Sequence, residues 1–300
     1  MAIDKSLLAP KHWPIWIGIG LLAVFGHLPA RTGRAIGRGC GALLALLARR
    51  RRQVAARNLA LCFPERDARW RAQLLRANFA AMGIGIYEFS RAWWGQTRDL
   101  EAGLQIDGLE ILQSLQQQGR GVLLLSGHFM TLDLCGRLLC SQQPAAAMYR
   151  RHRSAALEWA IKRGRLRYAS ALFTREDLRA AVRFLRQGGV LWYAPDQDMR
   201  GKDCVFAKFF GVPAATITAT HQLQRLTGAA VVPFFHHRDH DGNYHLRIGT
   251  ALAELPGESA LAHTSRVNAL IEQMVRAAPE QYLWVHQRFK TRPPEAPPVV

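Results

Sequence analysis

Cysteine is scarce in this chain of 300 residues, which contains five, an odd number. None of them forms a CxxC pair or has the spacing of zinc ligands, which argues against a disulfide framework and a structural zinc site. A reducing compartment fits this usage best, with the cysteines acting as small apolar packing residues. They are Cys40, Cys62, Cys135, Cys140 and Cys204.

Acidic residues are also few, with 22 Asp and Glu against 40 Lys and Arg, so the formal net charge is +18 at pH 7. An excess of this size predicts an anionic partner, and nucleic acid, anionic lipid and an acidic carrier protein all satisfy it. Because 49% of the residues are hydrophobic, most of the chain can form a sizeable core and is not expected to be disordered.

Two catalytic signatures are missing. The serine at position 126 lies in LLSGH rather than GxSxG, so a serine hydrolase is the lesser alternative. The histidine-rich stretch HHRDHDGNYH, residues 236–245, has no accompanying HExxH motif. A polar hairpin turn explains this stretch better than a metal site, and no metal is assigned.

An uncharged segment near the N-terminus runs from Trp13 to Ala30 and reads WPIWIGIGLLAVFGHLPA. Its length is near the lower limit for spanning a bilayer, and no A-x-A cleavage pattern follows it, so a retained anchor is predicted. More basic residues follow the segment than precede it, which favours a cytoplasmic main domain. A monotopic, partly inserted helix is the alternative.

A second apolar segment, GRAIGRGCGALLALL, carries small residues at Gly33, Gly37 and Gly41. This spacing predicts close approach to the first helix, in a membrane-bound helical hairpin. The run from Arg49 to Arg52 would then lie near anionic headgroups. A DNA-binding arm would explain these arginines but not the apolar segment before them.

The rest of the chain has the pattern of an α/β fold. Apolar runs predict buried strands at 122–125, 190–193 and 231–235, and the last of these pairs with 244–248 across a turn at 241–243. Helical patterns lie between them at 155–167, 176–187, 216–227 and 265–278. This alternation predicts a mixed sheet flanked by helices.

Three parts of the chain are expected. No internal repeat or Ser/Gly linker divides the main region, so residues 49–292 are taken as one domain. Residues 1–48 form the membrane anchor and its amphipathic hairpin. The proline-rich tail, residues 293–300, is expected to be disordered.

The stretch VLLLSGHFMTLD, from Val122 to Asp133, is the most informative part of the sequence. Residues five apart on one helix are rotated by roughly 140° and could not meet, so a partnership of His128 with Asp133 needs a break between them. Gly127 supplies a turn after the strand, which would let Asp133 fold back toward the imidazole. This is the geometry of an oriented general base.

Basic residues are dense after this motif, in YRRHRSAALEWAIKRGRLR from Tyr149 to Arg167. Arginine suits bidentate phosphate contacts, although a solvated helix face is the default interpretation of such a run. Asp196, in YAPDQD at the end of a predicted strand, is expected near the site as an organiser of the basic cluster. A helix cap or a salt bridge is the structural alternative.

Taken together, these motifs resemble those of a known family. HFMTLD matches the HxxxxD/E motif of glycerolipid acyltransferases, and the whole chain resembles more closely the late acyltransferases of lipid A biosynthesis. The resemblance implies a glycerol-3-phosphate acyltransferase-like fold. The matching segments are RNLALCFPE (57–65), YRRH (149–152), GRLR (164–167), WYAPDQD (192–198) and PEQYLWVHQRFKTRP (279–293).

The resemblance implies site roles. His128 would be the catalytic base and Asp133 its orienting acid, where many late acyltransferases carry Glu. Arg165 and Asp196 would support activity or organise the site. Independently of the resemblance, the density of the basic segment predicts that Arg150 and Arg163 bind the substrate with them.

The implied reaction moves a fatty acyl group from an acyl carrier protein thioester to a 3-hydroxyacyl chain of a Kdo-lipid IV-A type acceptor. It needs no metal or cofactor beyond the thioester co-substrate. The implied partners are acyl carrier protein, an anionic glycolipid and a membrane, without nucleic acid. The enzyme would lie at the bacterial inner membrane, single-pass or monotopic, with its catalytic domain in the cytoplasm. A mannosylated phosphoinositide acceptor and a non-catalytic anionic-lipid-binding protein are the alternatives.

Overall fold

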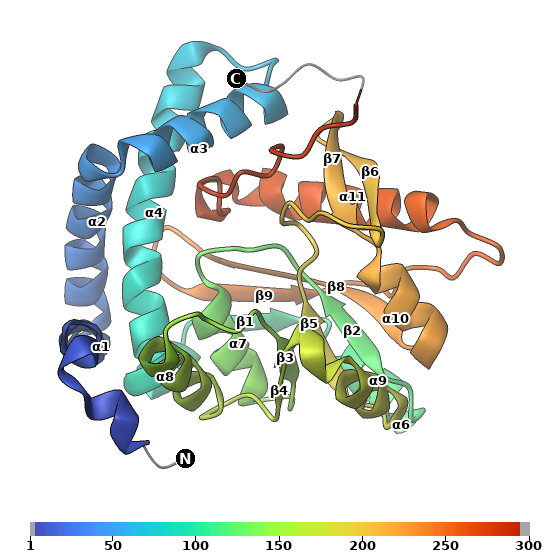
Figure 1. Ribbon diagram of the computed structural model, residues 1–300, viewed down its shortest axis with the longest axis horizontal. Coiled ribbons are helices and arrows are strands. Elements are labelled where there is room, and N and C mark those ends of the chain that lie inside the picture. Colours follow the sequence, from blue (N-terminus) through green and yellow to red (C-terminus); the bar gives the residue numbers. More distant parts are fainter. Residues whose placement is uncertain (1–3, 295–300) are drawn as a thin grey trace.

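A computed structural model describes residues 4–294, and a layer of helices forms one side of it (Figure 1). The predicted disordered tail falls outside these residues from position 295 onward. Helix α4 stands between the pair α1 and α2 and the rest of the molecule (Figure 1). The helical elements are η1 (Lys5–Leu8), η2 (Pro10–His12), α1 (Trp13–Gly26), α2 (Ala30–Leu47), α3 (Arg49–Cys62) and α4 (Ala68–Trp94).

The centre is a sheet of seven strands in the order β1-β9-β8-β2-β5-β3-β4. Every neighbouring pair is parallel except β8 and β9, which form an antiparallel hairpin. The predicted mixed sheet is therefore confirmed. The strands are β1 (Leu104–Asp107), β2 (Val122–Leu125), β3 (Ala146–Met148), β4 (Leu172–Phe173), β5 (Val190–Tyr193), β8 (Ala230–Arg238) and β9 (Tyr244–Ile248).

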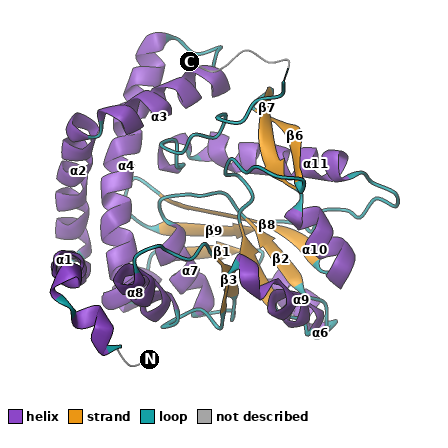
Figure 2. Ribbon diagram, in the orientation of Figure 1, coloured by secondary structure: helices purple, strands orange, loops and turns teal. Residues whose placement is uncertain are grey.

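Further helices and a small second sheet complete the fold (Figure 2). The predicted helix at 216–227 begins only at Ala219, because Thr216 and Ile217 belong to a strand. The second sheet pairs β6 (Cys204–Phe209) with β7 (Val212–Ile217). The helices are α5 (Arg98–Glu101), α6 (Leu109–Gln117), α7 (Leu132–Cys140), α8 (Ala155–Arg165), η3 (Arg175–Asp177), α9 (Leu178–Arg186), α10 (Ala219–Thr227), α11 (Ala260–Ala277) and η4 (Pro279–Gln281).

The two faces of the sheet carry separate cores. Leu123 and Leu125 of β2 pack into a core with α3, α9 and α11, whereas Val122 and Leu124 pack into another with α6 and α7. All four side chains are buried. This explains why β2 appears in the sequence as a continuous apolar run, since a strand covered on both faces needs no polar alternation.

The N-terminal apolar segment is shorter as a helix than the sequence suggested. Helix α1 has 14 residues and is therefore about 21 Å long, against a hydrocarbon core of about 30 Å. Within residues 4–294, no helix combines the length and the apolar character needed to cross a bilayer.

The glycine stripe of α2 packs on a different partner from the one predicted. Gly33, Gly37 and Gly41 are buried, and a Cβ added at each would collide with Tyr87, Ile84 or Phe79. All three of those neighbours lie on α4, so the expectation of contact with α1 was wrong. The absence of side chains lets the backbones of α2 and α4 approach closely.

Candidate active site

The candidate site lies at one edge of the sheet, where parallel strands end. Strands β2, β5 and β3 are parallel, so their carboxyl ends meet at this edge. His128 follows β2, Asp196 follows β5, and Arg150 follows β3. Residues that are far apart in the sequence are therefore brought to one place by the sheet topology.

His128 is held by Asp196 through two contacts. Its Nδ1 lies 2.5 Å from Oδ1 of Asp196, and its backbone N–H donates to Oδ2 over 2.8 Å. The imidazole is 27% exposed, whereas the carboxylate is 1% exposed. Because Nδ1 faces the carboxylate, the proton of a neutral imidazole lies there and the lone pair of Nε2 faces away.

The carboxylate of Asp196 stays ionised despite its burial. Desolvation alone would raise its pKa, but the imidazole and backbone of His128 and the hydroxyl of Tyr282 hold the pKa well below its usual range. A buried anion in contact with Nδ1 stabilises the imidazolium that forms when Nε2 accepts a proton. The pair therefore has the arrangement of a general base and its orienting acid.

Asp133 does not have the predicted partner. Its oxygens accept hydrogen bonds from Arg165 Nε at 2.8 Å, Trp93 Nε1 at 2.9 Å and Tyr168 at 2.9 Å. No hydrogen bond joins Asp133 to His128 within residues 4–294. The predicted pairing is corrected: β5 brings Asp196 to the imidazole, while α7 turns Asp133 toward α8.

Arg165 and Asp133 form a largely buried ion pair, with side chains 21% and 13% exposed. Burial would raise the pKa of Asp133, but the guanidinium of Arg165 and the three hydrogen-bond donors hold it below its usual value. Nη2 of Arg165 makes a second contact with Asp133 at 3.0 Å, so the fork is occupied by this carboxylate. Arg165 is thus placed to organise the wall of the site.

The other basic residues of Tyr149 to Arg167 are more open. Arg150 and Arg163 are exposed, and the guanidinium of Arg163 lies 5.3 Å from the ring centre of Trp159. Glu158 accepts from the Tyr149 hydroxyl, which fixes the loop after β3. Asp196 lies at the site, as expected, but its contacts are to His128, and within residues 4–294 no hydrogen bond or ion pair joins it to this basic cluster.

A segment late in the sequence, residues 279–286, supports the turn that carries His128. The sequence analysis did not predict this contact. The Leu283 N–H donates to the His128 carbonyl over 3.0 Å, and the Met130 N–H donates to the Gln281 carbonyl over 2.8 Å. Phe129 forms an antiparallel bridge with Tyr282. The segment thus acts as a short extra strand beside the catalytic turn.

Two buried asparagines hold this segment from the helical layer. Asn58 of α3 donates to the carbonyls of Trp284 and His286, each over 2.7 Å. Asn78 of α4 donates to the carbonyl of Tyr282 over 2.7 Å. The motif RNLALCFPE contains Asn58, and PEQYLWVHQRFKTRP contains its partners Trp284 and His286. The sequence therefore marked both segments but did not show that they contact each other.

Two cavities lie next to the pair. One borders His128 and Asp196 and is lined by Tyr282, Trp284 and His286 among others. The second is larger and mainly apolar and lies between α7, β3 and α8; its lining includes Leu132, Asp133, Gly136, Leu139, Cys140, Arg165, Tyr168, Leu172 and Trp192. Trp192 lines the second cavity, and its ring stands edge-on to His128 with the ring centres 6.0 Å apart.

Ser126 is not presented as a nucleophile. It is fully buried, and its Oγ lies 3.4 Å from Nε2 of His236. Within the described residues it makes no hydrogen bond to His128. The serine hydrolase alternative therefore finds no support in this geometry.

The His–Asp pair has the arrangement of a general base and its orienting acid, and the comparisons specify the family. The family model described as bacterial lipid A biosynthesis acyltransferase matches residues 1–291, and the chain belongs to this family. The chain is thus an acyltransferase.

Three curated relatives are similar over nearly their whole length, all from Escherichia coli strain K12. Identity is 37% to the lipid A biosynthesis lauroyltransferase, covering 98% of this chain and 97% of that one. It is also 37% to the palmitoleoyltransferase, covering 97% and 95%. The myristoyltransferase is 28% identical, covering 97% and 91%.

Proposed function

We propose that this enzyme transfers a fatty acyl group from an acyl carrier protein thioester to a hydroxyl on an acyl chain of a lipid A precursor. The observation that carries the proposal is the His128–Asp196 pair, which directs Nε2 of a partly exposed imidazole away from its carboxylate. The names of the relatives support the lipid acceptor.

The chemistry follows from this geometry. Nε2 of His128 removes the proton of the acceptor hydroxyl as the oxygen attacks the thioester carbonyl carbon. The tetrahedral intermediate then expels the thiolate as the C–S bond breaks, and the imidazolium returns a proton to the sulfur. Asp196 holds the ring throughout and stabilises its charged form.

The apolar cavity suits the acyl chain of the donor. Aliphatic, aromatic and small side chains line most of it, together with the Asp133–Arg165 pair, and Trp192 in its lining stands edge-on to His128. Each buried CH₂ of a chain adds about 0.8 kcal/mol of binding free energy. The depth of the cavity would therefore set which chain length binds best.

Replacing Gly136 by methionine is expected to shift the preference toward shorter donors by roughly two carbons, because the new side chain occupies cavity space. A Cβ at Gly136 would meet only the Tyr168 ring, at an ordinary 3.8 Å, so the backbone need not move. The measurement is kcat/KM for a series of acyl thioesters. Gly39→Met, at a position with open space, is the matched control. An unchanged series in Gly136→Met, or a change only in acceptor KM, would contradict this assignment.

Exposed arginines suit the charged substrates. Arg150 stands at the same sheet edge as His128, and Arg163 lies on α8 near the tryptophans of α4. Guanidinium groups bind phosphate in bidentate fashion, so these two are assigned to the acceptor. Arg165 is already occupied by Asp133 and is assigned to shaping the site. An acidic carrier protein complements the remaining positive surface.

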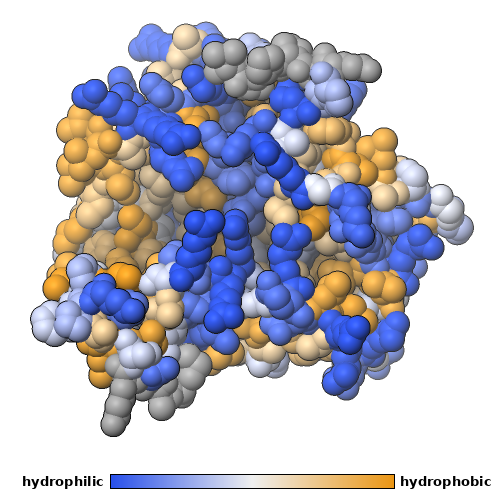
Figure 3. Space-filling view, in the orientation of Figure 1, coloured by the Kyte–Doolittle hydropathy of each residue, from blue (hydrophilic) through white to orange (hydrophobic). Residues whose placement is uncertain are grey.

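The outer face of α1 and α2 suits a membrane surface. Four large apolar side chains on one face of α1 are between 59% and 68% exposed: Trp13, Ile17, Leu21 and Val24. On α2, Leu46 and Leu47 are 64% and 69% exposed and precede the arginines of α3. Figure 3 shows hydrophobic surface along the edge formed by these helices. We assign this edge to shallow insertion into one leaflet of an anionic bilayer, the bacterial inner membrane, with the site on the cytoplasmic side.

The double variant Leu21→Glu, Val24→Glu is expected to weaken binding to anionic phospholipid vesicles on the order of 100-fold. The reason is that two aliphatic side chains, which would be buried in the bilayer, are replaced by charged ones. Vesicle co-sedimentation measures the partition. Leu226→Glu is the matched control, since Leu226 is 53% exposed on α10. Equal partitioning of all three proteins would exclude this edge as the membrane contact.

The direct test of the proposed function is product analysis. The purified enzyme is given a tetra-acylated lipid A precursor, with and without Kdo, and acyl carrier protein thioesters of several lengths. Mass spectrometry should find the acceptor heavier by one acyl group, with release of one thiol per product. Thiol release without an acylated lipid, or no turnover with any donor, would overturn the proposal.

A further inference from the structure

The proposed chemistry uses no residue of the histidine-rich stretch, and one of these residues, His236, has an unusual position. His236 lies on β8 and is fully buried. Its ring packs against Phe234 and Phe129, with ring centres 5.1 Å and 5.6 Å away. A buried polar side chain of this kind needs partners, because an unpaired one costs free energy on folding.

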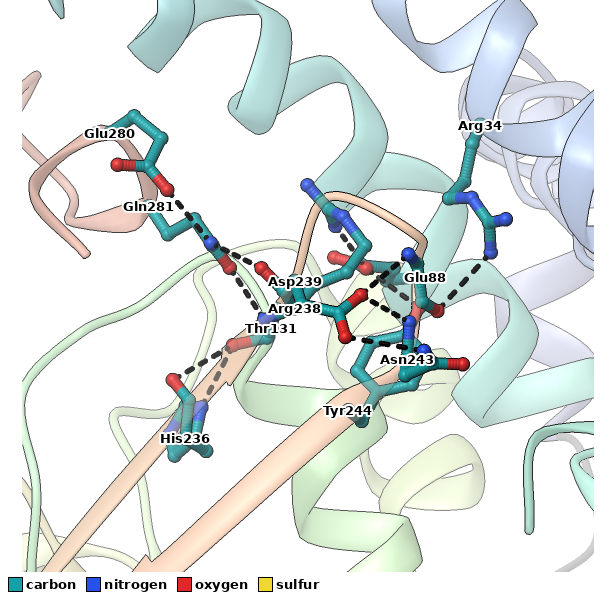
Figure 4. Close-up of polar contacts among 11 residues, drawn as sticks. Arg34, Glu88, Thr131, His236, Arg238, Asp239, Asn243, Tyr244, Glu280 and Gln281 are labelled. Carbon is teal, nitrogen blue, oxygen red and sulfur yellow. Dashed lines mark hydrogen bonds and ion pairs between the residues drawn. The ribbon is translucent and has the colours of Figure 1, made fainter. Parts of the chain in front are cut away.

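The partners of His236 are the two hydroxyl groups on either side of the catalytic turn. Its Nδ1 lies 2.8 Å from Oγ1 of Thr131, and its Nε2 lies 3.4 Å from Oγ of Ser126 (Figure 4 shows the Thr131 contact). Ser126 directly follows β2, and Thr131 directly precedes α7. The turn of residues 127–130, with His128, lies between these two contacts.

The chemistry of a neutral imidazole suits this place. Burial lowers the pKa of His236 to about 3, so the ring carries no charge in the physiological range. A neutral imidazole offers one donor and one acceptor, and a hydroxyl group can be either. The His236 side chain can therefore hydrogen-bond to the hydroxyl group at each end of the turn without placing a second charge near His128.

The other side of the turn has its own support. The Gln281 carbonyl accepts from the Met130 N–H, and the Gln281 side chain bonds both the N–H and the carbonyl of Arg238 on β8 (Figure 4). Arg238 forms a buried ion pair with Glu88 of α4. Removing His236 would thus release one side of the turn while this second support remains.

We propose that His236 is a positioning residue, which joins Ser126 and Thr131 and thereby fixes the turn that presents the His128 imidazole to Asp196. This inference rests on the proposed function, because it takes His128 as the base. Small displacements of a catalytic group are costly, since about 1 Å can lower a rate on the order of 100-fold.

The test compares two substitutions at this position. His236→Phe keeps an aromatic ring in the core but loses both hydrogen-bonding nitrogens, and kcat is expected to fall roughly 10- to 100-fold with both KM values within about twofold of the parent. His236→Asn places an amide group near Nδ1 and is expected to recover most of kcat through Thr131. Acyl transfer is assayed on protein whose thermal unfolding shows that it is folded.

A matched control and a second variant keep the test decisive. His237→Phe changes the next residue of β8, which points to the opposite face and stacks on His245, and should leave kcat unchanged. Thr131→Val keeps His236 but removes its nearer partner, and should repeat the loss of kcat even if His236→Phe does not fold.

The outcomes separate this inference from the function on which it rests. Unchanged kcat in folded His236→Phe, equal loss in the Phe and Asn variants, or normal kcat in Thr131→Val would overturn the positioning role. None of these results would affect the assignment of His128, which fails only if the enzyme turns over without that residue.

Discussion

Replacing His128 by alanine is expected to lower kcat on the order of 10³-fold, within the ~10²–10⁴-fold range that a positioned base contributes. The physical reason is that the proposed mechanism assigns the proton transfer to Nε2 of His128, whereas His286 in the same cavity uses its Nε2 to accept from the Asp198 N–H. Both KM values should change little, because the imidazole acts in the transition state rather than in ground-state binding. Single-turnover transfer to the lipid acceptor, followed by mass spectrometry, measures the effect.

The control for this variant is His240→Ala at an exposed position of the β8–β9 hairpin. It should have normal kcat and a normal melting temperature. His128→Ala should unfold at a temperature close to that of the parent, since the side chain is partly exposed. Turnover near the parent level in folded His128→Ala would remove the general-base mechanism.

Replacing Asp196 by asparagine is expected to have an effect of similar size, roughly 10³-fold on kcat. The amide keeps the volume of the carboxylate but can donate to Nδ1, which would move the imidazole proton to Nε2 and leave the wrong nitrogen to face the substrate. It also removes the buried negative charge that stabilises the imidazolium. The pH dependence of kcat, measured with the rate, reports the loss of this charge.

The comparison with Asp133 decides which carboxylate orients the base. Asp133→Asn leaves the guanidinium of Arg165 with a weaker partner, so it should lower the stability of the fold. The double variant Asp133→Asn, Arg165→Gln should recover part of the stability that Asp133→Asn loses, since the two residues act as a pair. If the double variant is no better, while Asp196→Asn retains normal kcat, Asp133 and not Asp196 is the orienting acid.

Strand positions were predictable where burial made the pattern continuous. Strands β2, β5 and β9 occupy the predicted residues 122–125, 190–193 and 244–248, and β8 pairs with β9 as expected. Helix α4, by contrast, was not predicted. It packs against α2, α7 and α8 together with apolar, small and charged residues, so it has no single apolar face for a helical pattern to show. β1 alternates polar and partly buried residues and gives no continuous apolar run.

The residues of the site were predictable, but their pairing was not. His128 and Asp196 both follow buried strands, and the sequence marked each of them. The spacing from His128 to Asp133 suggested a local partner, yet the true contact depends on β2 and β5 being neighbours in the sheet. Sequence spacing does not contain strand order, so a long-range partner could only come from the fold.

The segment that pairs with the turn from His128 to Met130 gives the enzyme an order of events during synthesis. Helices α1 and α2 leave the ribosome before the residues from Pro279 to His286 do. Until this segment forms its hydrogen bonds with Asn58 and Asn78, the turn lacks its neighbouring strand. The turn that carries His128 is therefore completed only after residues 279–286 have been synthesised and have packed against α3 and α4.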